Sequence, residues 1–460
     1  MSYDMVTADF EGEWHDAAEL YRNWMQENAD MPVKLRDNIN IPEWLAESPL
    51  VMIYPIRGKF SDKTNSKIMT LFMHWEGTAP WAPPYVWPPF GGEVLFRDFV
   101  DTMHKKGNLV GVYCSGIGWT VKSTLQPDFD LSDRYDESLI CRTPADTIEQ
   151  TRIIGDEIRY GLDMCPYDTE KVGNIASGEI ISIAKSGCDY AQYFDQNLGG
   201  ESSFCYAQNH GHPAGPGIWQ NESMIRLFRK IRMDLDAIGS PMLLGCEGAS
   251  SEPFIEYLTF NDLRYVFGFL AGNPVPAYAY LFHEYINNFT GNQDWIEGSM
   301  DPLDNPECLL FRLAYSFAAG DVLSVTLGDQ GNVIWGWGVQ WDKKIPGQEQ
   351  IFTLIRNLNA WRRQYKEFLC LGKMVKPLEL EETGDYILYL RKKIKIVYKS
   401  LLTTRWENTE GVQRQVIVNF MPYEQTCKIR CNKVYRFPED TGTTYKGSLK
   451  VASLNAVWVE

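Results

Sequence analysis

Continuous apolar runs alternate along most of the chain with segments whose apolar residues recur at helical spacing. Strand-like runs occupy 49–58, 108–119, 160–166, 188–197, 241–252, 273–285 and 319–328. Helical spacing occupies 13–28, 92–107, 144–160, 170–187, 221–238 and 348–369. Strands that are apolar along their whole length are covered on both faces, as in parallel α/β sheets. This alternation predicts a (β/α)8 TIM barrel. No glycine-rich dinucleotide or phosphate loop follows the first strand, which disfavours an open doubly wound sheet.

The pattern changes near residue 373, where short segments of strand-like alternation are separated by turn residues. These segments are YILYLRKKIKIVYKSLL, VQRQVIVNF, CKIRCNKVYRF and LKVASLNAVWVE. We therefore predict three parts along the chain. A helical lead-in covers 1–48, a (β/α)8 catalytic barrel covers 49–372, and a small all-β domain of the β-sandwich type covers 373–460.

Acidic residues stand at the ends of three consecutive strand-like runs. Asp195 follows CDYAQYF, Glu247 follows PMLLGC, and Glu284 ends the run that begins at residue 273. In a parallel barrel the reactive groups lie at the carboxyl ends of the strands, so these acids are expected on one face. Glycoside hydrolysis needs such a pair, because one carboxyl protonates the leaving oxygen while the other attacks the sugar. The structural alternative is that each acid caps a helix or binds a loop amide.

Asp195 and Glu247 are our candidates for the catalytic pair. Glu247 lies at an apolar strand end flanked by cysteine and glycine, which favours a raised pKa by desolvation, whereas Gln196 and Asn197 can donate hydrogen bonds to ionised Asp195. Neighbouring parallel strands lie about 4.8 Å apart. The two carboxyl groups are therefore expected at the short separation of a retaining enzyme, roughly 5–5.5 Å.

Other residues are candidates for contacts with a sugar. Aromatic residues make up 13% of the chain, with 15 Trp, and aromatic faces pack against sugar rings as well as filling cores. Glu252 follows Glu247 in the same loop and is the substitute acid/base. The remaining candidates for the substrate site are Trp119, Asn197, His210, His212, His283 and Glu284.

The loop CYAQNHGHPAGPG, residues 205–217, leaves a second chemistry open. Cys205, His210 and His212 are donor types that zinc prefers, although their spacing matches no standard zinc finger, and HEY at 283 is not H-E-x-x-H. The alternatives to a glycosidase are therefore a metal-dependent hydrolase built on this loop and a non-catalytic carbohydrate-binding protein. For the glycosidase we expect no metal and no cofactor, with the two histidines binding sugar hydroxyls or bracing the loop.

The composition narrows the choice of partners. Lys and Arg number 44 against 60 Asp and Glu, and the net charge of −16 disfavours nucleic acid as a partner. The N-terminus lacks the basic and apolar regions of a signal peptide. The longest apolar region, 266–282, is interrupted by glycine and proline, which disfavours a membrane span. We expect a soluble, cytoplasmic protein whose partner is a glycoside or oligosaccharide substrate.

The order AAELYRNW, YFDQN, C…HGHP, CEG and HEY, followed by a small β domain, resembles an uncharacterised bacterial family of glycosidase-like TIM barrels, known as a domain of unknown function. More distantly, YFDQN is similar to the K-x-D-x-N strand end of melibiase-type α-galactosidases, whose aspartate is the nucleophile, although Tyr193 replaces the lysine. A nucleophile on the fourth strand and a glutamate on the fifth is closer to endo-α-N-acetylgalactosaminidases and the α-amylase class. The resemblance implies a retaining enzyme for an α-linked sugar. Relatives usually carry a β-sandwich ahead of the barrel, so we expect a short form or a fragment.

Overall fold

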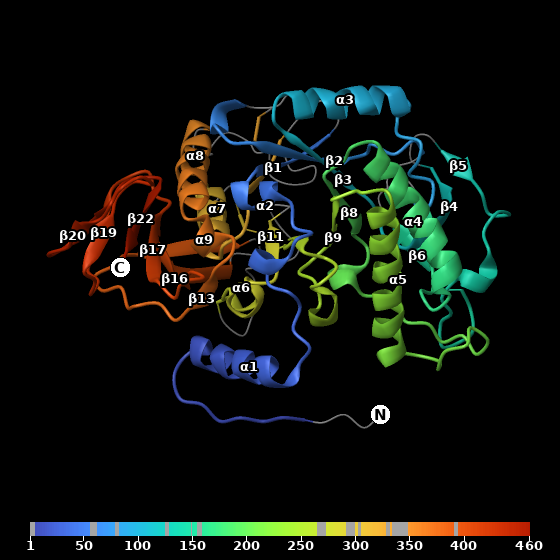
Figure 1. Ribbon diagram of the computed structural model, residues 1–460, viewed down its shortest axis with the longest axis horizontal. Helices are drawn as coiled ribbons and strands as arrows, with labels where there is room; N and C mark the ends of the chain where they lie inside the picture. The colour runs from blue at the N-terminus through green and yellow to red at the C-terminus, as the bar shows by residue number, and fades with distance from the viewer. Residues whose placement is uncertain are drawn as a thin grey trace.

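The centre of the molecule is a set of parallel strands, seen in blue, green and yellow in Figure 1. The computed structural model describes residues 5–55, 62–78, 82–124, 128–148, 150–153, 159–264, 273–290, 300–301, 305–327, 332–333, 348–390 and 394–460. Six strands pair side by side in the order β12-β1-β2-β3-β8-β9, and β10 pairs with β11 in a second parallel sheet. The bounds of these strands are β1 Leu50–Pro55, β2 Ile68–Met73, β3 Leu109–Tyr113, β8 Tyr190–Phe194, β9 Leu243–Cys246, β10 Phe260–Asp262, β11 Asn287–Phe289 and β12 Ser324–Thr326.

Two single bridges connect the parallel sheets to each other. Glu247, after β9, pairs in parallel with Asp262 of β10, and Phe289 of β11 pairs in parallel with Val322, just before β12. The residues of β2, β3, β8, β9, β10, β11 and β12 are buried. This burial agrees with the continuous apolar runs of the sequence, because strands that are covered on both faces need no polar alternation.

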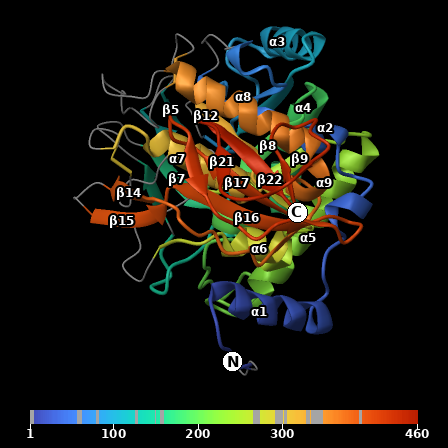
Figure 2. The same cartoon turned by 90° about the vertical axis from the view of Figure 1, so that its left-hand side faces the viewer.

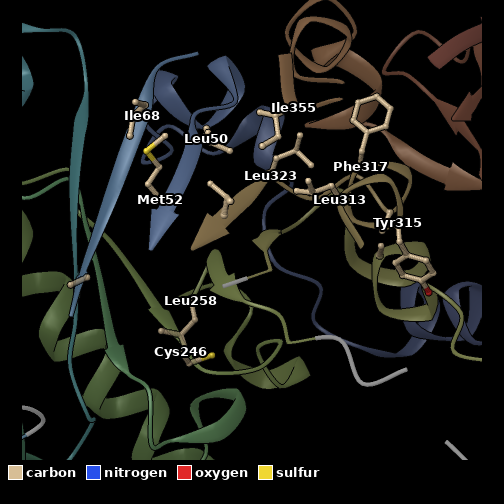
Figure 3. Close-up of a cluster of buried hydrophobic side chains, with 14 of the residues drawn as sticks. Leu50, Met52, Ile68, Cys246, Leu258, Leu313, Tyr315, Phe317, Leu323 and Ile355 are labelled. Atoms are coloured by element: carbon tan, nitrogen blue, oxygen red, sulfur yellow. The ribbon is translucent and has the colours of Figure 1, made fainter. Parts of the chain in front are cut away.

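Helices cover the outer side of the parallel strands. The helices α3 (Glu93–Lys105), α4 (Thr169–Lys185) and α5 (Ile218–Ala237) lie outside β2, β3 and β8 in Figure 1. In α5, buried Leu227, Ile231 and Leu235 recur at helical spacing, so one face of the helix packs inward. A continuous apolar core joins the strands to the helices, and Figure 3 shows Leu50, Ile68 and Leu323 among its members.

An antiparallel sheet is inserted between β3 and α4. It has the order β5-β4-β7-β6, with β4 Gly118–Ser123, β5 Phe129–Asp130, β6 Gln150–Ile153 and β7 Arg159–Asp163. The predicted helix over 144–160 is wrong, because 150–153 pairs with β7 instead of forming helical turns. Residues 149 and 154–158 of that prediction lie outside the described residues, as do residues 56–58 of the first predicted strand.

The predicted strand over 273–285 is also wrong. Residues Ala277–Phe282 form the helix α6, and the strand of this region, β11, begins only at Asn287. The sequence AYAYLF is apolar on every side, and such a short run suits a buried helix as well as a strand. Pro276 precedes the first residue of the helix, a position that needs no backbone donor.

The C-terminal part of the chain is all-β and antiparallel. Its largest sheet has the order β13-β16-β17-β22-β19-β20, accompanied by the pairs β14-β15 and β18-β21. The strands are β13 Lys373–Val375, β14 Asp385–Leu390, β15 Ile394–Lys399, β16 Leu401–Glu407, β17 Gln413–Asn419, β18 Gln425–Cys427, β19 Lys433–Tyr435, β20 Thr443–Thr444, β21 Leu449–Val451 and β22 Asn455–Val459.

Two helices lie between this sheet and the parallel strands. Helix α7 (Cys308–Ala318) contacts β16 and β17, and α8 (Gln348–Gln364) contacts β22 (Figures 1 and 2). The Thr404 hydroxyl in β16 donates a hydrogen bond of 2.6 Å to the carbonyl oxygen of Ala318. The remaining α-helices are α1 Trp14–Asn28, α2 Glu43–Glu47 and α9 Lys366–Leu369. Among the described residues, no helix has both the length and the apolar character that a membrane span requires.

Candidate functional site

Asp195 and Glu247 lie at the carboxyl ends of two neighbouring parallel strands. Along the chain these are the fourth and fifth strands of the parallel sheets, β8 and β9. The N–H of Glu247 donates a hydrogen bond of 3.3 Å to the carbonyl oxygen of Phe194, so the ends of the two strands are joined directly. The guanidinium group of Arg264 contacts both carboxyl groups. The fold therefore brings together the two acids that the sequence singled out.

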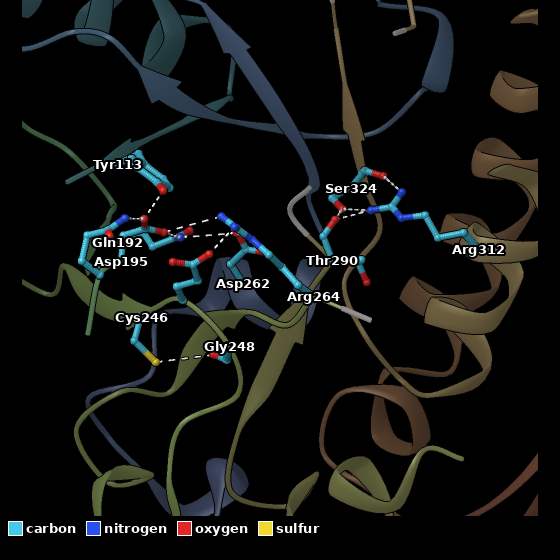
Figure 4. A network of polar contacts seen from close by, with 12 residues as sticks. Tyr113, Gln192, Asp195, Cys246, Gly248, Asp262, Arg264, Thr290, Arg312 and Ser324 are labelled. Atoms are coloured by element: carbon cyan, nitrogen blue, oxygen red, sulfur yellow. Dashed lines mark hydrogen bonds and ion pairs between the residues drawn. The ribbon is translucent and has the colours of Figure 1, made fainter. Parts of the chain in front are cut away.

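Asp195 is completely buried and receives three side-chain hydrogen bonds. The Nε2 of Gln192 donates to Oδ1 at 2.8 Å, and the hydroxyl of Tyr113 donates to Oδ2 (Figure 4). The Nε2 of Gln196 also donates to Oδ2, at 3.1 Å. Burial raises the pKa of Asp195 to about 6, although the charge of Arg264 and the Tyr113 hydrogen bond act in the opposite direction.

Arg264 lies among three carboxylates. Its Nη1 contacts Oε1 of Glu247, its Nη2 lies 3.6 Å from Oδ1 of Asp195, and its Nε lies 3.2 Å from Oδ2 of Asp262. The side chain of Arg264 is only 14% exposed, and Figure 4 shows it reaching from its own strand end toward Asp195. A guanidinium presents several donors in a fixed plane, so this one group can hold all three acids in place.

Glu247 carries the higher pKa of the pair. Burial raises the pKa of its carboxyl group to about 8, and the negative charge of Asp195 raises it further, while Arg264 opposes both effects. At neutral pH, Glu247 therefore keeps its proton while most of Asp195 is ionised. Two carboxyl groups whose environments separate their pKa values in this way can act as an acid and as a nucleophile or base.

Asn197 lies next to this pair and holds two loops together. Its Oδ1 accepts a hydrogen bond of 3.0 Å from the backbone N–H of Ile117, and its Nδ2 donates one of 2.9 Å to the carbonyl oxygen of Glu201. Trp119 lies two residues beyond Ile117, on β4, where its ring contacts Tyr85 edge to face at 6.2 Å between centroids. The bond to Ile117 connects the segment before β4 with the loop that follows Asp195, whereas the ring contact connects β4 with the loop between β2 and α3.

Three other predicted residues have their contacts elsewhere among the described residues. Glu252 begins a short 3-10 helix, Glu252–Phe254, and accepts a hydrogen bond of 2.8 Å from the hydroxyl of Tyr21 in α1. Glu284 forms an ion pair of 2.6 Å with Lys34. His283 is buried between backbone carbonyl oxygens, with Nδ1 at 2.9 Å from that of Gly372 and Nε2 at 3.2 Å from that of Gly320. Desolvation lowers the pKa of His283 to about 4, although the hydrogen bonds to the two carbonyl oxygens act in the opposite direction.

His210 and His212 contact thiols instead of the acid pair. The Nδ1 of His210 lies 3.5 Å from the sulfur of Cys205, and the Nε2 of His212 lies 3.4 Å from the sulfur of Cys165. The ring of His212 stacks on Trp219, with centroids 3.7 Å apart and planes 12° apart. These residues form a second polar cluster, separate from the carboxylates.

Sequence reasoning missed Tyr113, Gln192, Asp262 and Arg264. Tyr113 and Gln192 lie within strands and look like core residues in the sequence. Asp262 and Arg264 belong to β10 and its end, and β10 has only three residues, too few for a strand pattern. One rule could have found Asp262 and Arg264, namely that reactive side chains lie at the carboxyl ends of parallel strands. The same rule located Asp195.

Comparisons with known proteins agree with the arrangement of the fold. A family model described as DUF6259, a domain of unknown function, matches residues 1–292. No curated protein matches the chain in sequence. The structure is similar to that of an alpha-N-acetylgalactosaminidase, NagBb from Bifidobacterium bifidum, in complex with GalNAc, at a TM-score of 0.56 and 14% identity. This similarity covers 90% of the present chain and 63% of that chain, so the protein spans less than two thirds of its length.

Other similar structures are also glycoside hydrolases by description. A GH31 family sulfoquinovosidase from E. rectale in complex with an aza-sugar inhibitor has a TM-score of 0.55 and 8% identity, over 96% of the present chain and 65% of that chain. An alpha-amylase from Geobacillus thermoleovorans complexed with acarbose has a TM-score of 0.52 and 12% identity, over 90% of the present chain and 98% of that chain. At this identity the similarity concerns the fold.

Proposed function

The chain belongs to the DUF6259 family, and from its pair of buried carboxyl groups, Asp195 and Glu247, we propose that the protein is a glycoside hydrolase of the retaining type. The observation that carries the proposal is that Asp195 and Glu247 stand at adjacent strand ends and are both contacted by the guanidinium group of Arg264. The folds of the similar structures support it, because they are described as glycosidases and amylases.

The proposed architecture is a closed (β/α)8 barrel of the TIM type, followed by a β-sandwich. The bridges from Glu247 to Asp262 and from Phe289 to Val322 support closure, because they connect the two parallel sheets at both of their ends. We propose that the barrel domain covers residues 49–372, after a lead-in over 1–48 and before the β-sandwich over 373–460. The catalytic face is then the one that carries Asp195, Glu247 and Arg264, where barrel enzymes have their active sites.

In the proposed mechanism, ionised Asp195 attacks the anomeric carbon while protonated Glu247 donates its proton to the leaving oxygen. Glu247, now ionised, then takes a proton from the water that releases the sugar from Asp195. The positions of the two carboxyl groups at adjacent strand ends and their shared contact with Arg264 support the short separation of a retaining enzyme, because an inverting enzyme leaves about 6.5–9.5 Å between them for a water molecule. Their pKa values, about 6 and about 8, lie in the order that these roles require.

Arg264 and Tyr113 are positioning residues in this scheme. The positive charge of Arg264 and the hydroxyl of Tyr113 both favour the ionised form of Asp195, which burial alone would disfavour. Asp262 binds the Nε of Arg264 and receives a weaker bond of 3.4 Å from Gln192, so it fixes the guanidinium relative to Asp195. The substrate would be an α-linked sugar, by analogy with the descriptions of the alpha-N-acetylgalactosaminidase and the alpha-amylase.

The test is hydrolysis of a panel of α- and β-configured aryl glycosides by the purified protein and by matched variants. We expect hydrolysis of an α-glycoside, complete loss in Asp195→Asn, and a loss of about 10²–10⁴-fold in Glu247→Gln that shrinks as the leaving group becomes more acidic. A 5-fluoro glycosyl fluoride of the same sugar should leave a covalent adduct on Asp195, located by peptide mass spectrometry.

Glu252→Gln is the matched control, because Glu252 ends the same loop but bonds to Tyr21 instead of Asp195. Loss of activity in Glu252→Gln with full activity in Glu247→Gln would move the acid/base role to Glu252. An adduct on another residue, or full activity in Asp195→Asn, would refute the assignment of the nucleophile. Sugar binding without any hydrolysis would favour a carbohydrate-binding protein.

A further inference from the structure

Two cysteines and two histidines converge beside the inserted sheet. Cys165 follows β7, while Cys205, His210 and His212 belong to the loop between β8 and α5. One nitrogen or sulfur atom of each residue lies within 4.8 Å of the corresponding atoms of the other three. Cys165, Cys205 and His212 are buried, and His210 is half-buried. Four soft or borderline donors are therefore gathered in a mostly dry site.

Two distances within this cluster match the edges of a zinc tetrahedron. Zinc binds sulfur at about 2.3 Å and imidazole nitrogen at about 2.0–2.1 Å, so a tetrahedral angle places sulfur and nitrogen ligands about 3.6 Å apart. The sulfur of Cys165 lies 3.4 Å from Nε2 of His212, and the sulfur of Cys205 lies 3.5 Å from Nδ1 of His210. Both pairs thus already have nearly the separation that a shared ion imposes.

The hydrogen bonds of His212 fix which of its nitrogens is free to bind. Its Nδ1 lies 2.9 Å from the carbonyl oxygen of Pro213, and a carbonyl oxygen can only accept, so Nδ1 carries the hydrogen. The lone pair is therefore on Nε2, the atom that faces Cys165. Imidazoles that bind metals usually have their second nitrogen bonded to a carbonyl or carboxylate in this way.

The surroundings of the thiols also suit a metal. The backbone N–H of Arg142 donates to the sulfur of Cys205 at 3.5 Å, which favours the thiolate form that a metal binds. The buried Cys141 packs in one cluster with Cys165 and Cys205 and lies outside the group of four.

We propose that Cys165, Cys205, His210 and His212 bind one zinc ion. Four protein ligands complete a tetrahedron and leave no open position for water, so the ion has a structural role. It would tie the loop over 201–217 to the end of the inserted sheet, and through Asn197 and Glu201 it would steady the loop that follows Asp195. This inference does not depend on the proposed glycosidase activity, and it separates the metal from the catalytic chemistry.

The test is the metal content of untagged protein expressed with added zinc, measured by plasma mass spectrometry. We expect about one zinc ion per chain in the wild type and a loss of at least about fivefold in Cys205→Ser and in His210→Gln. Cys431→Ser is the matched control, because Cys431 lies in the C-terminal part of the chain, beyond β18, and should keep the full zinc content. Unchanged zinc content in both ligand variants would overturn the proposal.

A second measurement uses the wild type alone, in case a variant fails to fold. Reduced protein freed of metal and given Co²⁺ should develop the absorption of a tetrahedral site together with sulfur-to-cobalt charge transfer. Protein that takes up neither Zn²⁺ nor Co²⁺ would overturn the proposal. So would alkylation and mass spectrometry that find Cys165 or Cys205 joined in a disulfide in freshly purified protein. Zinc-loaded protein without glycosidase activity would leave the zinc site supported and count only against the proposed function.

Discussion

Arg264→Gln tests whether one buried guanidinium keeps the candidate nucleophile ionised. The nearest nitrogen of Arg264 lies 3.6 Å from Asp195, where two unit charges interact by about 4–5 kcal/mol at an effective dielectric constant of about 20. An opposite charge at such a distance typically lowers a carboxyl pKa by about one to three units. Removing it should therefore raise the pKa of Asp195 from about 6 to roughly 8.

The shift in the pKa of Asp195 predicts how much activity Arg264→Gln loses. At pH 7 the ionised fraction of Asp195 would fall from about nine-tenths to about one-tenth, so kcat/KM should fall about tenfold. The pKa of Glu247 should rise too, because Arg264 also lowers that value. Both limbs of a bell-shaped pH profile should thus move to higher pH, and the variant should recover activity as the pH is raised from 7 to 9.

The assay is kcat/KM against pH, from pH 5 to 10, for the wild type, Arg264→Gln and a control. Arg356→Gln is the control, because Arg356 also pairs with a carboxylate, Glu349 at 2.8 Å, but on the surface of α8. Its profile should match that of the wild type. A profile of Arg264→Gln whose acid limb stays in place, or moves to lower pH, would refute the electrostatic reasoning.

Two further predictions concern stability. The pKa of Glu247 is about 8 in the folded protein and about 4.3 in an unfolded chain, so the folded state binds the proton more tightly. The free energy of unfolding should therefore decrease as the pH rises from about 4 to 8. In Glu247→Gln this decrease, measured by urea unfolding at pH 5 and pH 8, should be smaller than in the wild type. An equal decrease in both proteins would contradict the raised pKa. Gly245→Ala should destabilise by roughly 1–3 kcal/mol in the same assay, because its Cβ would collide with the Tyr190 hydroxyl and the Phe260 carbonyl oxygen. Gly178→Ala, a helical site with open space, should instead stabilise by about 0.5–1 kcal/mol, and equal effects would argue against the collision.

The sequence predicted the features that local pattern determines. Continuous apolar runs identified most of the long parallel strands, and the rule that barrel strands end at the reactive face located Asp195 and Glu247. Both inferences need only residues that are close together in the chain. The all-β character of the C-terminal part followed in the same way from its alternation.

Features that depend on distant contacts were missed. His283 contacts the carbonyl oxygens of Gly320 and Gly372, and no local sequence pattern predicts contacts with residues so distant in the chain. The same holds for Cys165, which meets the loop of His212 only after the inserted sheet has folded. The short run at 277–282 became a helix because its apolar residues carry no periodicity, so packing alone decided between the two possibilities.

The pairing of β1 with β12 affects how this protein can be divided for expression. The family match ends at residue 292, but β1 takes one of its two neighbours from Ser324–Thr326, with Val51 opposite Ser324. A gene fragment that stops at 292 would leave that edge of β1 without a partner and remove α7 and α8 from the apolar core. An unpaired, apolar strand edge is a template for aggregation. Recombinant work on this protein should therefore extend past residue 292 and keep the C-terminal sheet.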